Sequence, residues 1–162
     1  MDLLEAKSRV AEALVESIFR RARYEVQPFR IEHTPLRLGR EDFSPDFRVC
    51  LPGENGDRQE LLVEVKYRPS VEQFISVENQ RGDRSIFLMA RRHWPLLYFV
   101  LVTDRPLAGR SCFQAIAFSQ LKPGEPFQTV DLEQLDELRI FRNNLADHEE
   151  LVRRIMGLLA AA

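Results

Sequence analysis

Three polar residues of the chain, Asp46, Glu64 and Lys66, have the types and spacing that metal-assisted phosphate chemistry requires. Carboxylate oxygens are the ligands that magnesium prefers, and magnesium often completes its shell with water and a substrate phosphate. A metal held by these carboxylates would polarise a phosphoryl oxygen and lower the pKa of a bound water. The Lys66 ammonium would orient that water or offset the charge that develops on the phosphate.

A predicted hairpin brings these three residues together. The stretches 46–51 and 60–67 flank an Asn-Gly pair at 55–56, which readily adopts the positive φ values of a tight turn, so the two strands are expected to pair antiparallel. Side chains alternate along a strand, so Glu64 and Lys66 share one face and the intervening valines share the other. The start of the first strand, with its aspartate, then lies beside the end of the second.

The Pro45-Asp46 pair followed by Glu64-Val65-Lys66 resembles the motif of the PD-(D/E)XK nuclease superfamily, which includes restriction endonucleases and Holliday-junction resolvases. The resemblance implies a restriction endonuclease-like core over about residues 5–118, with a central mixed sheet of roughly four to five strands flanked by helices. It also implies hydrolysis of DNA phosphodiester bonds with Mg2+, or Mn2+, as the cofactor. In that reading Asp46, Glu64 and the Val65 carbonyl bind the metal, and Lys66 orients the attacking water.

The resemblance further implies an acidic catalytic residue on the first helix. Residues 2–23 are predicted to form that helix, because apolar residues recur mostly at three- and four-residue steps. Glu12 lies about three turns before its end and is preferred, with Glu16 as the alternative, since i and i+4 share a helix face. Gln80 stands where some members carry a glutamine on the next helix, but Arg84 replaces the aromatic residue expected four positions on.

The remaining pattern predicts a mixed α/β fold in one domain, residues 1–162, with a C-terminal helical extension over 131–160. Besides the hairpin, apolar runs predict further strands at 24–31, 96–103 and 112–118. Helical spacing predicts helices at 85–94, 132–141 and 147–159. Residues 70–85 hold few apolar anchors and are interpreted as a weak helix or a loop over the site.

The amino-acid composition limits the classes of protein to which this chain can belong. With 44% hydrophobic and 30% charged residues the chain should fold, and its formal net charge of -2 argues against non-specific coating of nucleic acid. The longest apolar run is far shorter than the roughly 20 residues of a membrane helix, and the first residues do not resemble a signal peptide, so a cytoplasmic protein is expected. The cysteines and histidines lack the spacing of zinc ligands.

Two functions remain open from the sequence. The first is a magnesium-dependent endonuclease or DNase with DNA as its partner. The second is a non-catalytic DNA-binding or assembly subunit with the same PD-(D/E)XK fold, whose protein partner would supply affinity or cleavage. Cutting a duplex often takes two sites, so a homodimer is compatible with the first function.

Overall fold

The computed structural model describes residues 2–29, 36–38, 41–53, 55–118, 121–122 and 124–161. They form a six-stranded mixed sheet in the order β1-β4-β5-β6-β7-β8 and a separate two-stranded sheet of β2 and β3. The strands are β1 (Glu25–Pro28), β2 (Leu36–Leu38), β3 (Glu41–Phe43), β4 (Phe47–Pro52), β5 (Arg58–Tyr67), β6 (Leu97–Val102), β7 (Phe113–Ile116) and β8 (Thr129–Asp131). The helices are α1 (Leu3–Arg21), α2 (Val71–Arg81), α3 (Ile86–His93) and α4 (Arg142–Ala161), with 3-10 turns η1 (Gly82–Arg84), η3 (Leu132–Gln134) and η4 (Asp136–Leu138).

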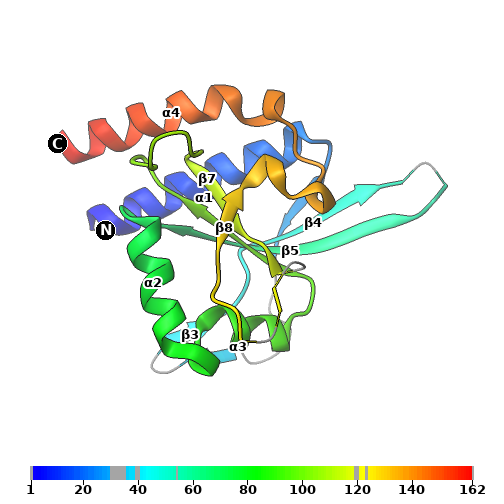
Figure 1. The fold of residues 1–162 in the computed structure, drawn as a ribbon. Helices are drawn as coiled ribbons and strands as arrows, with labels where there is room; N and C mark the ends of the chain where they lie inside the picture. The colour runs from blue at the N-terminus through cyan, green and yellow to red at the C-terminus, as the bar shows by residue number, and fades with distance from the viewer. Residues whose placement is uncertain are drawn as a thin grey trace.

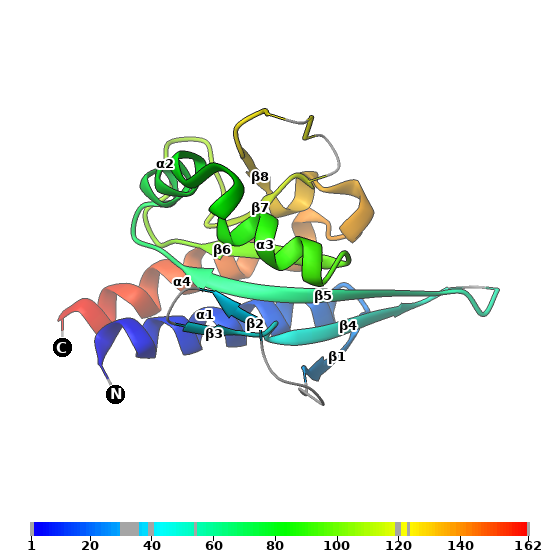
Figure 2. The ribbon, with the colours of Figure 1, turned by 90° about the horizontal axis from the view of Figure 1, so that it is seen from below.

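Helices cover both faces of the large sheet, with α1 and α4 on one face and α2 and α3 on the other (Figures 1 and 2). All six residues of β6 are buried, as expected for a strand in the middle of a covered sheet. Its side chains alternate, so Val100 packs in the cluster with α1 and α4, whereas Phe99 packs in the cluster with α2 and α3. The predicted mixed α/β class is confirmed.

The predicted hairpin is formed by β4 and β5. The two strands pair antiparallel, with Phe47 opposite Val63 and Pro52 opposite Arg58. Gly56 has a φ of 80°, the left-handed conformation that the turn requires and that glycine adopts at little cost. β5 then pairs parallel with β6 through the helical crossover of α2, η1 and α3, so the first half of the sheet contains both pairing modes.

The predicted first helix is also confirmed and is capped at its N-terminus. The Asp2 side chain accepts a hydrogen bond of 2.7 Å from the backbone N–H of Glu5, which satisfies a donor that the helix leaves open. The helix lies beside α4, and both termini lie at the same end of this pair (Figure 1). No helix among the described residues combines the length and apolar character needed to cross a membrane.

The structure decides one open prediction of secondary structure and corrects another. Of the two alternatives predicted for residues 70–85, the helix is confirmed: Ser70 caps α2, whose eleven residues are followed by η1. The helix predicted over 132–141 is wrong. Its apolar residues, Leu132, Leu135 and Leu138, recur every three residues, the repeat of a 3-10 helix, and they lie buried in η3, η4 and the residue between them.

The sheet is also larger than predicted. The strand expected at 24–31 is β1 and ends at Pro28, and the last part of the predicted range lies outside the described residues. The short strands β2, β3 and β8 were not predicted, because three residues are too few to show a strand period. β8 forms the far edge of the large sheet by pairing with β7, so residues after 118 contribute to the sheet as well as to helices.

Candidate functional site

Asp46 lies immediately before β4 and is held against β5 by two hydrogen bonds. Its backbone N–H donates to the Val63 carbonyl over 2.9 Å, and its side-chain Oδ2 accepts from the backbone N–H of Val65 over 2.8 Å. The second bond takes the place of the backbone hydrogen bond that a further paired residue of β4 would have made with the Val65 N–H. The aspartate carboxylate is therefore oriented by the backbone of the strand that carries Glu64 and Lys66.

The Val65 carbonyl lies on the same edge of β5 as this N–H, because the two backbone groups of one strand residue point to the same neighbouring strand. The pairing of β4 with β5 starts at Phe47 opposite Val63. The carbonyl of Val65 therefore lies beyond the paired part of β4, on the side occupied by the Asp46 carboxylate. This is the position from which a backbone oxygen could join the carboxylates as a ligand.

Glu64 is a buried acid, 6% exposed, on the face of β5 opposite to the α1–α4 layer. Burial raises the pKa of Glu64, a side-chain hydrogen bond to Asp46 and the charge of Asp46 raise it further, and the Lys66 ammonium partly opposes these effects. Two carboxyl groups joined by a hydrogen bond cannot both carry a charge at low cost. In the metal-free protein this pair therefore holds a proton at neutral pH.

Glu12, rather than Glu16, is the acid of helix α1 whose charge acts on the pair. Burial and the charge of Asp46 raise the pKa of Glu12, while Arg9 lowers it, and the charge of Glu12 in turn raises the pKa of Glu64. Glu16 instead forms an ion pair of 3.2 Å with Arg20 on the helix surface. Helix packing thus places one of the two candidate acids where its charge acts on the carboxyl pair and directs the other to an arginine.

Phe43 forms an aromatic wall beside Lys66, and sequence reasoning did not identify it. The Lys66 Nζ lies 5.6 Å from the centroid of the Phe43 ring, a cation–π distance, and the ring is 6% exposed. The ring also contacts Phe99 of the sheet and Trp94 after α3. The signal available in the sequence was a bulky apolar residue three positions before Asp46, although no predicted element placed it there.

The structure does not bring Gln80 to this site. Gln80 is exposed in the last turn of α2 and lines a cavity of about 630 Å³ together with Arg110, Phe127 and other residues. Neither Glu64 nor Lys66 lines that cavity. Gln80 therefore has no evident part in the chemistry at the carboxyl pair.

Metal binding at the site would need backbone, water or substrate oxygens in addition to side chains. Among the residues that the structure describes, no group of three or more His, Cys, Asp or Glu side chains is arranged to hold a metal ion by itself. The oxygens that converge at β5 are two carboxylates and the Val65 carbonyl. Such hard donors suit magnesium, which keeps waters and takes substrate oxygens, and do not suit zinc, which prefers nitrogen and sulfur.

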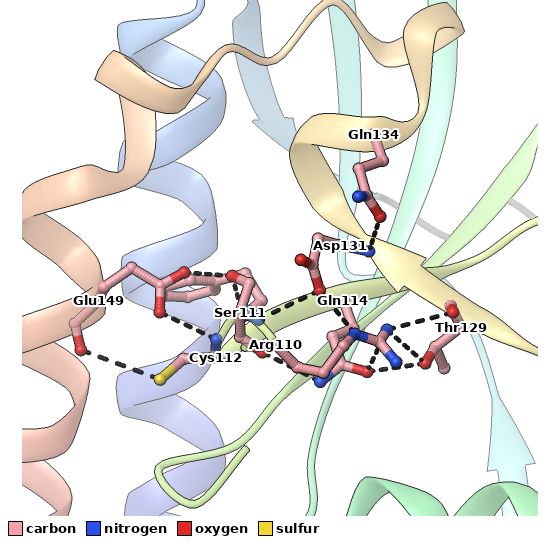
Figure 3. A network of polar contacts seen from close by, with 9 residues as sticks. Arg110, Ser111, Cys112, Gln114, Thr129, Asp131, Gln134 and Glu149 are labelled. Atoms are coloured by element: carbon pink, nitrogen blue, oxygen red, sulfur yellow. Dashed lines mark hydrogen bonds and ion pairs between the residues drawn. The ribbon is translucent and has the colours of Figure 1, made fainter. Parts of the chain in front are cut away.

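A second polar network, shown in Figure 3, joins the end of the sheet to α4. Glu149 of α4 accepts hydrogen bonds from the Ser111 hydroxyl and, over 2.9 Å, from the backbone N–H of Cys112. Burial and the Glu149 carboxylate raise the pKa of the Cys112 thiol to about 12, so the thiol is not a nucleophile at neutral pH. The Arg110 guanidinium donates to Asp131 and so links β8 to the loop before β7. This network is structural.

Comparisons with known proteins do not assign a family. No family model, no curated protein and no solved structure matches the chain. The function is therefore inferred from the site itself.

Proposed function

We propose that this protein is a metal-dependent nuclease with a restriction endonuclease-like core, and that it hydrolyses phosphodiester bonds in DNA. The observation that carries the proposal is the buried Glu64 carboxyl of β5, hydrogen-bonded to Asp46 before β4 and lying near the Lys66 amine, with Glu12 of α1 close enough for its charge to raise the pKa of Glu64. Buried acids that raise one another's pKa are costly to stability and are typical of functional sites. The mixed sheet and the β4–β5 hairpin are consistent with the proposed core.

Asp46, Glu64 and the Val65 carbonyl would hold the cofactor, Mg2+ or Mn2+. When bound there, the ion supplies a Lewis acid for the phosphoryl oxygen and lowers the pKa of a coordinated water. The hydrogen bond from the Val65 N–H fixes the Asp46 carboxylate before any ligand arrives, so little reorganisation is needed. The donor set is small enough to leave room for water and a substrate phosphate.

The remaining residues act on water and on charge. Lys66, kept close to the carboxyl pair beside Phe43, donates hydrogen bonds to the attacking water or to a phosphate oxygen and offsets negative charge in the transition state. Glu12 is half-buried, so its carboxylate would be able to accept a hydrogen bond from a water at the edge of the pair. Hydrolysis then needs no covalent intermediate on the protein.

Cleavage of supercoiled plasmid and of branched DNA with Mg2+ or Mn2+ tests the proposal. Asp46→Asn is the sharpest variant, because the amide oxygen can still accept the Val65 N–H bond while the ligand charge is lost. Lys66→Met should lower the cleavage rate by about 10²–10³-fold, the usual effect of removing one group that stabilises transition-state charge. The matched control is Asp57→Asn, the same chemical change at an exposed position of the hairpin turn.

The outcomes separate the two functions. Cleavage by wild type and by the Asp57 variant, with loss in the Asp46 and Lys66 variants, supports the nuclease. Equal cleavage by wild type and Asp46→Asn contradicts it. Wild-type protein that binds DNA and cuts neither substrate with either metal would favour the non-catalytic binding or assembly subunit.

A further inference from the structure

A cluster of aromatic rings lies on the same face of the sheet as the candidate site. Phe99 of β6 stands opposite Glu64 of β5 in the parallel register, and its ring lies 5.9 Å from that of Phe43, measured between centroids. The Phe43 ring in turn lies 5.7 Å from the ring of Trp94 and 5.6 Å from the Lys66 Nζ. The rings therefore border the carboxyl pair and the amine on the side of the sheet that α2 and α3 cover.

Phe29 links the same cluster to Asp46. Its backbone N–H donates to the Asp46 carbonyl over 3.1 Å, which continues the antiparallel register of β1 and β4 by one residue. Residues opposite each other on paired strands project from the same face, so the Phe29 ring lies on the face that carries the Asp46 side chain. This ring contacts Trp94, with centroids 6.1 Å apart. The ring contacts that begin at Lys66 therefore end beside Asp46.

Part of this cluster remains open to solvent. Phe99 and Phe43 are only 0% and 6% exposed, whereas Phe29 and Trp94 are half-buried. His93, whose ring centroid lies 4.3 Å from that of Trp94, is exposed. The buried rings hold the half-buried ones in place, so the cluster offers solvent an aromatic surface that is ordered before any ligand arrives.

An aromatic surface beside a phosphate site suits a nucleobase. Bases stack on aromatic side chains with little dependence on sequence, because every base has a π-face. Inside a duplex both faces of a base are covered by its neighbours, so a base must be unpaired or turned out of the helix before it can stack on the protein.

We propose that Phe29 and Trp94 form a stacking subsite for an unpaired nucleobase next to the phosphate held at the carboxyl pair, and that the substrate is single-stranded DNA or the single-stranded part of a branched DNA. The inference rests on the proposed nuclease function and adds to it the structural class of the DNA. Stacking supplies affinity that does not depend on positive charge, which agrees with the formal net charge of -2.

The fluorescence of Trp94 tests the stacking directly, because the chain contains a single tryptophan. Wild-type protein is titrated in EDTA, which prevents cleavage, with a short single strand of DNA. The strand should quench the emission up to saturation. A strand of the same length made of abasic nucleotides keeps the phosphates and should quench little, and a blunt duplex of that length should also quench little because its bases are paired.

Anisotropy of a fluorescein-labelled single strand, measured in EDTA over a series of salt concentrations, tests the residues. Trp94→Leu and Phe29→Leu should each weaken binding by about 10-fold, the size of effect expected when one stacked base loses its aromatic partner. The slope of log K against log salt should stay the same, because the phosphate contacts remain. The matched control is Phe141→Leu, the same chemical change at a ring that is 65% exposed immediately before α4. Leucine keeps an apolar side chain at each position, and thermal unfolding verifies that the variants fold.

Four results would overturn the subsite: equal quenching by the abasic strand, equal binding of duplex and single strand by wild type, affinity in both variants equal to that of Phe141→Leu, or a loss of affinity that comes with a smaller salt slope. If one of these accompanies normal cleavage by wild type, the subsite fails and the nuclease stands. If quenching and the selective loss of affinity are observed while wild type cuts no DNA, the subsite stands and the nuclease fails.

Discussion

Replacing Glu64 by glutamine should remove a pH dependence of stability from the metal-free protein. Burial, followed by the hydrogen bond and charge of Asp46, raises the pKa of Glu64 from 4.5 to about 10. Between these two pH values the folded protein holds a proton that the unfolded chain releases. Stability from this group is therefore fully present below the unfolded pKa and is lost as pH rises toward the folded pKa.

The magnitude follows from the number of protons. When the folded state holds one proton more than the unfolded chain, the free energy of unfolding falls by about 1.4 kcal/mol for each unit of pH increase. The free energy of unfolding of wild type should therefore fall by about 2 kcal/mol between about pH 7 and pH 8.5. For a chain of this length that loss corresponds to a fall in melting temperature of about 4–8 °C. The lowered pKa of His148 places its titration below this range.

The assay is urea unfolding in EDTA at several pH values across that range, for wild type, Glu64→Gln and Glu60→Gln. Glutamine keeps the size of the side chain and can donate a hydrogen bond to Asp46, so the fold should persist without the proton. Glu60 is the matched control, an exposed acid on the same strand whose carboxylate lies 3.1 Å from Arg48. Glu64→Gln should show a slope smaller by about 1.4 kcal/mol per pH unit than the other two proteins. An unchanged slope in Glu64→Gln would refute the buried proton.

Further predictions concern the structural contacts. Glu149→Ala should destabilise the fold by about 2–4 kcal/mol in urea unfolding, because the Ser111 hydroxyl and the Cys112 N–H lose their acceptor, whereas the exposed Glu150→Ala should change little. Tyr24→Phe should cost about 1–2 kcal/mol, measured in the same way, since the hydroxyl donates to a buried backbone carbonyl of η4 over 2.5 Å. In a variant lacking the other cysteine, native Cys112 should resist alkylation by iodoacetamide at about pH 8 and react on unfolding, which mass spectrometry can measure; rapid alkylation of the folded protein would contradict the raised pKa.

Local chemistry made part of this fold predictable from the sequence. The apolar spacing of residues 2–23 predicts α1, and the glycine at 56 predicts the turn between β4 and β5. Once that hairpin is placed, alternation along β5 puts Glu64 and Lys66 on one face. Each of these features depends on residues close together in the chain, so its signal is contained in a short window.

Elements that depend on distant partners were harder to predict. The three-residue strands β2, β3 and β8 are too short to show a period, and β8 exists because β7 offers an edge for pairing. The segment 132–138 has leucines at a spacing compatible with either kind of helix, and burial of Leu132, Leu135 and Leu138 under the sheet is compatible with the tighter 3-10 turns.

For the candidate site, the sequence by itself determined the residue types and the shared face of Glu64 and Lys66. Tertiary structure decided the rest. The rotation of α1 against the sheet places Glu12 rather than Glu16 where its charge acts on the carboxyl pair, and because β4 begins at Phe47, the Asp46 side chain accepts the Val65 N–H. The physical reason is that the apolar spacing of a helix does not decide which of two residues on the same helix face, four positions apart, points at the site. Packing of the helix against elements far away in the chain decides it.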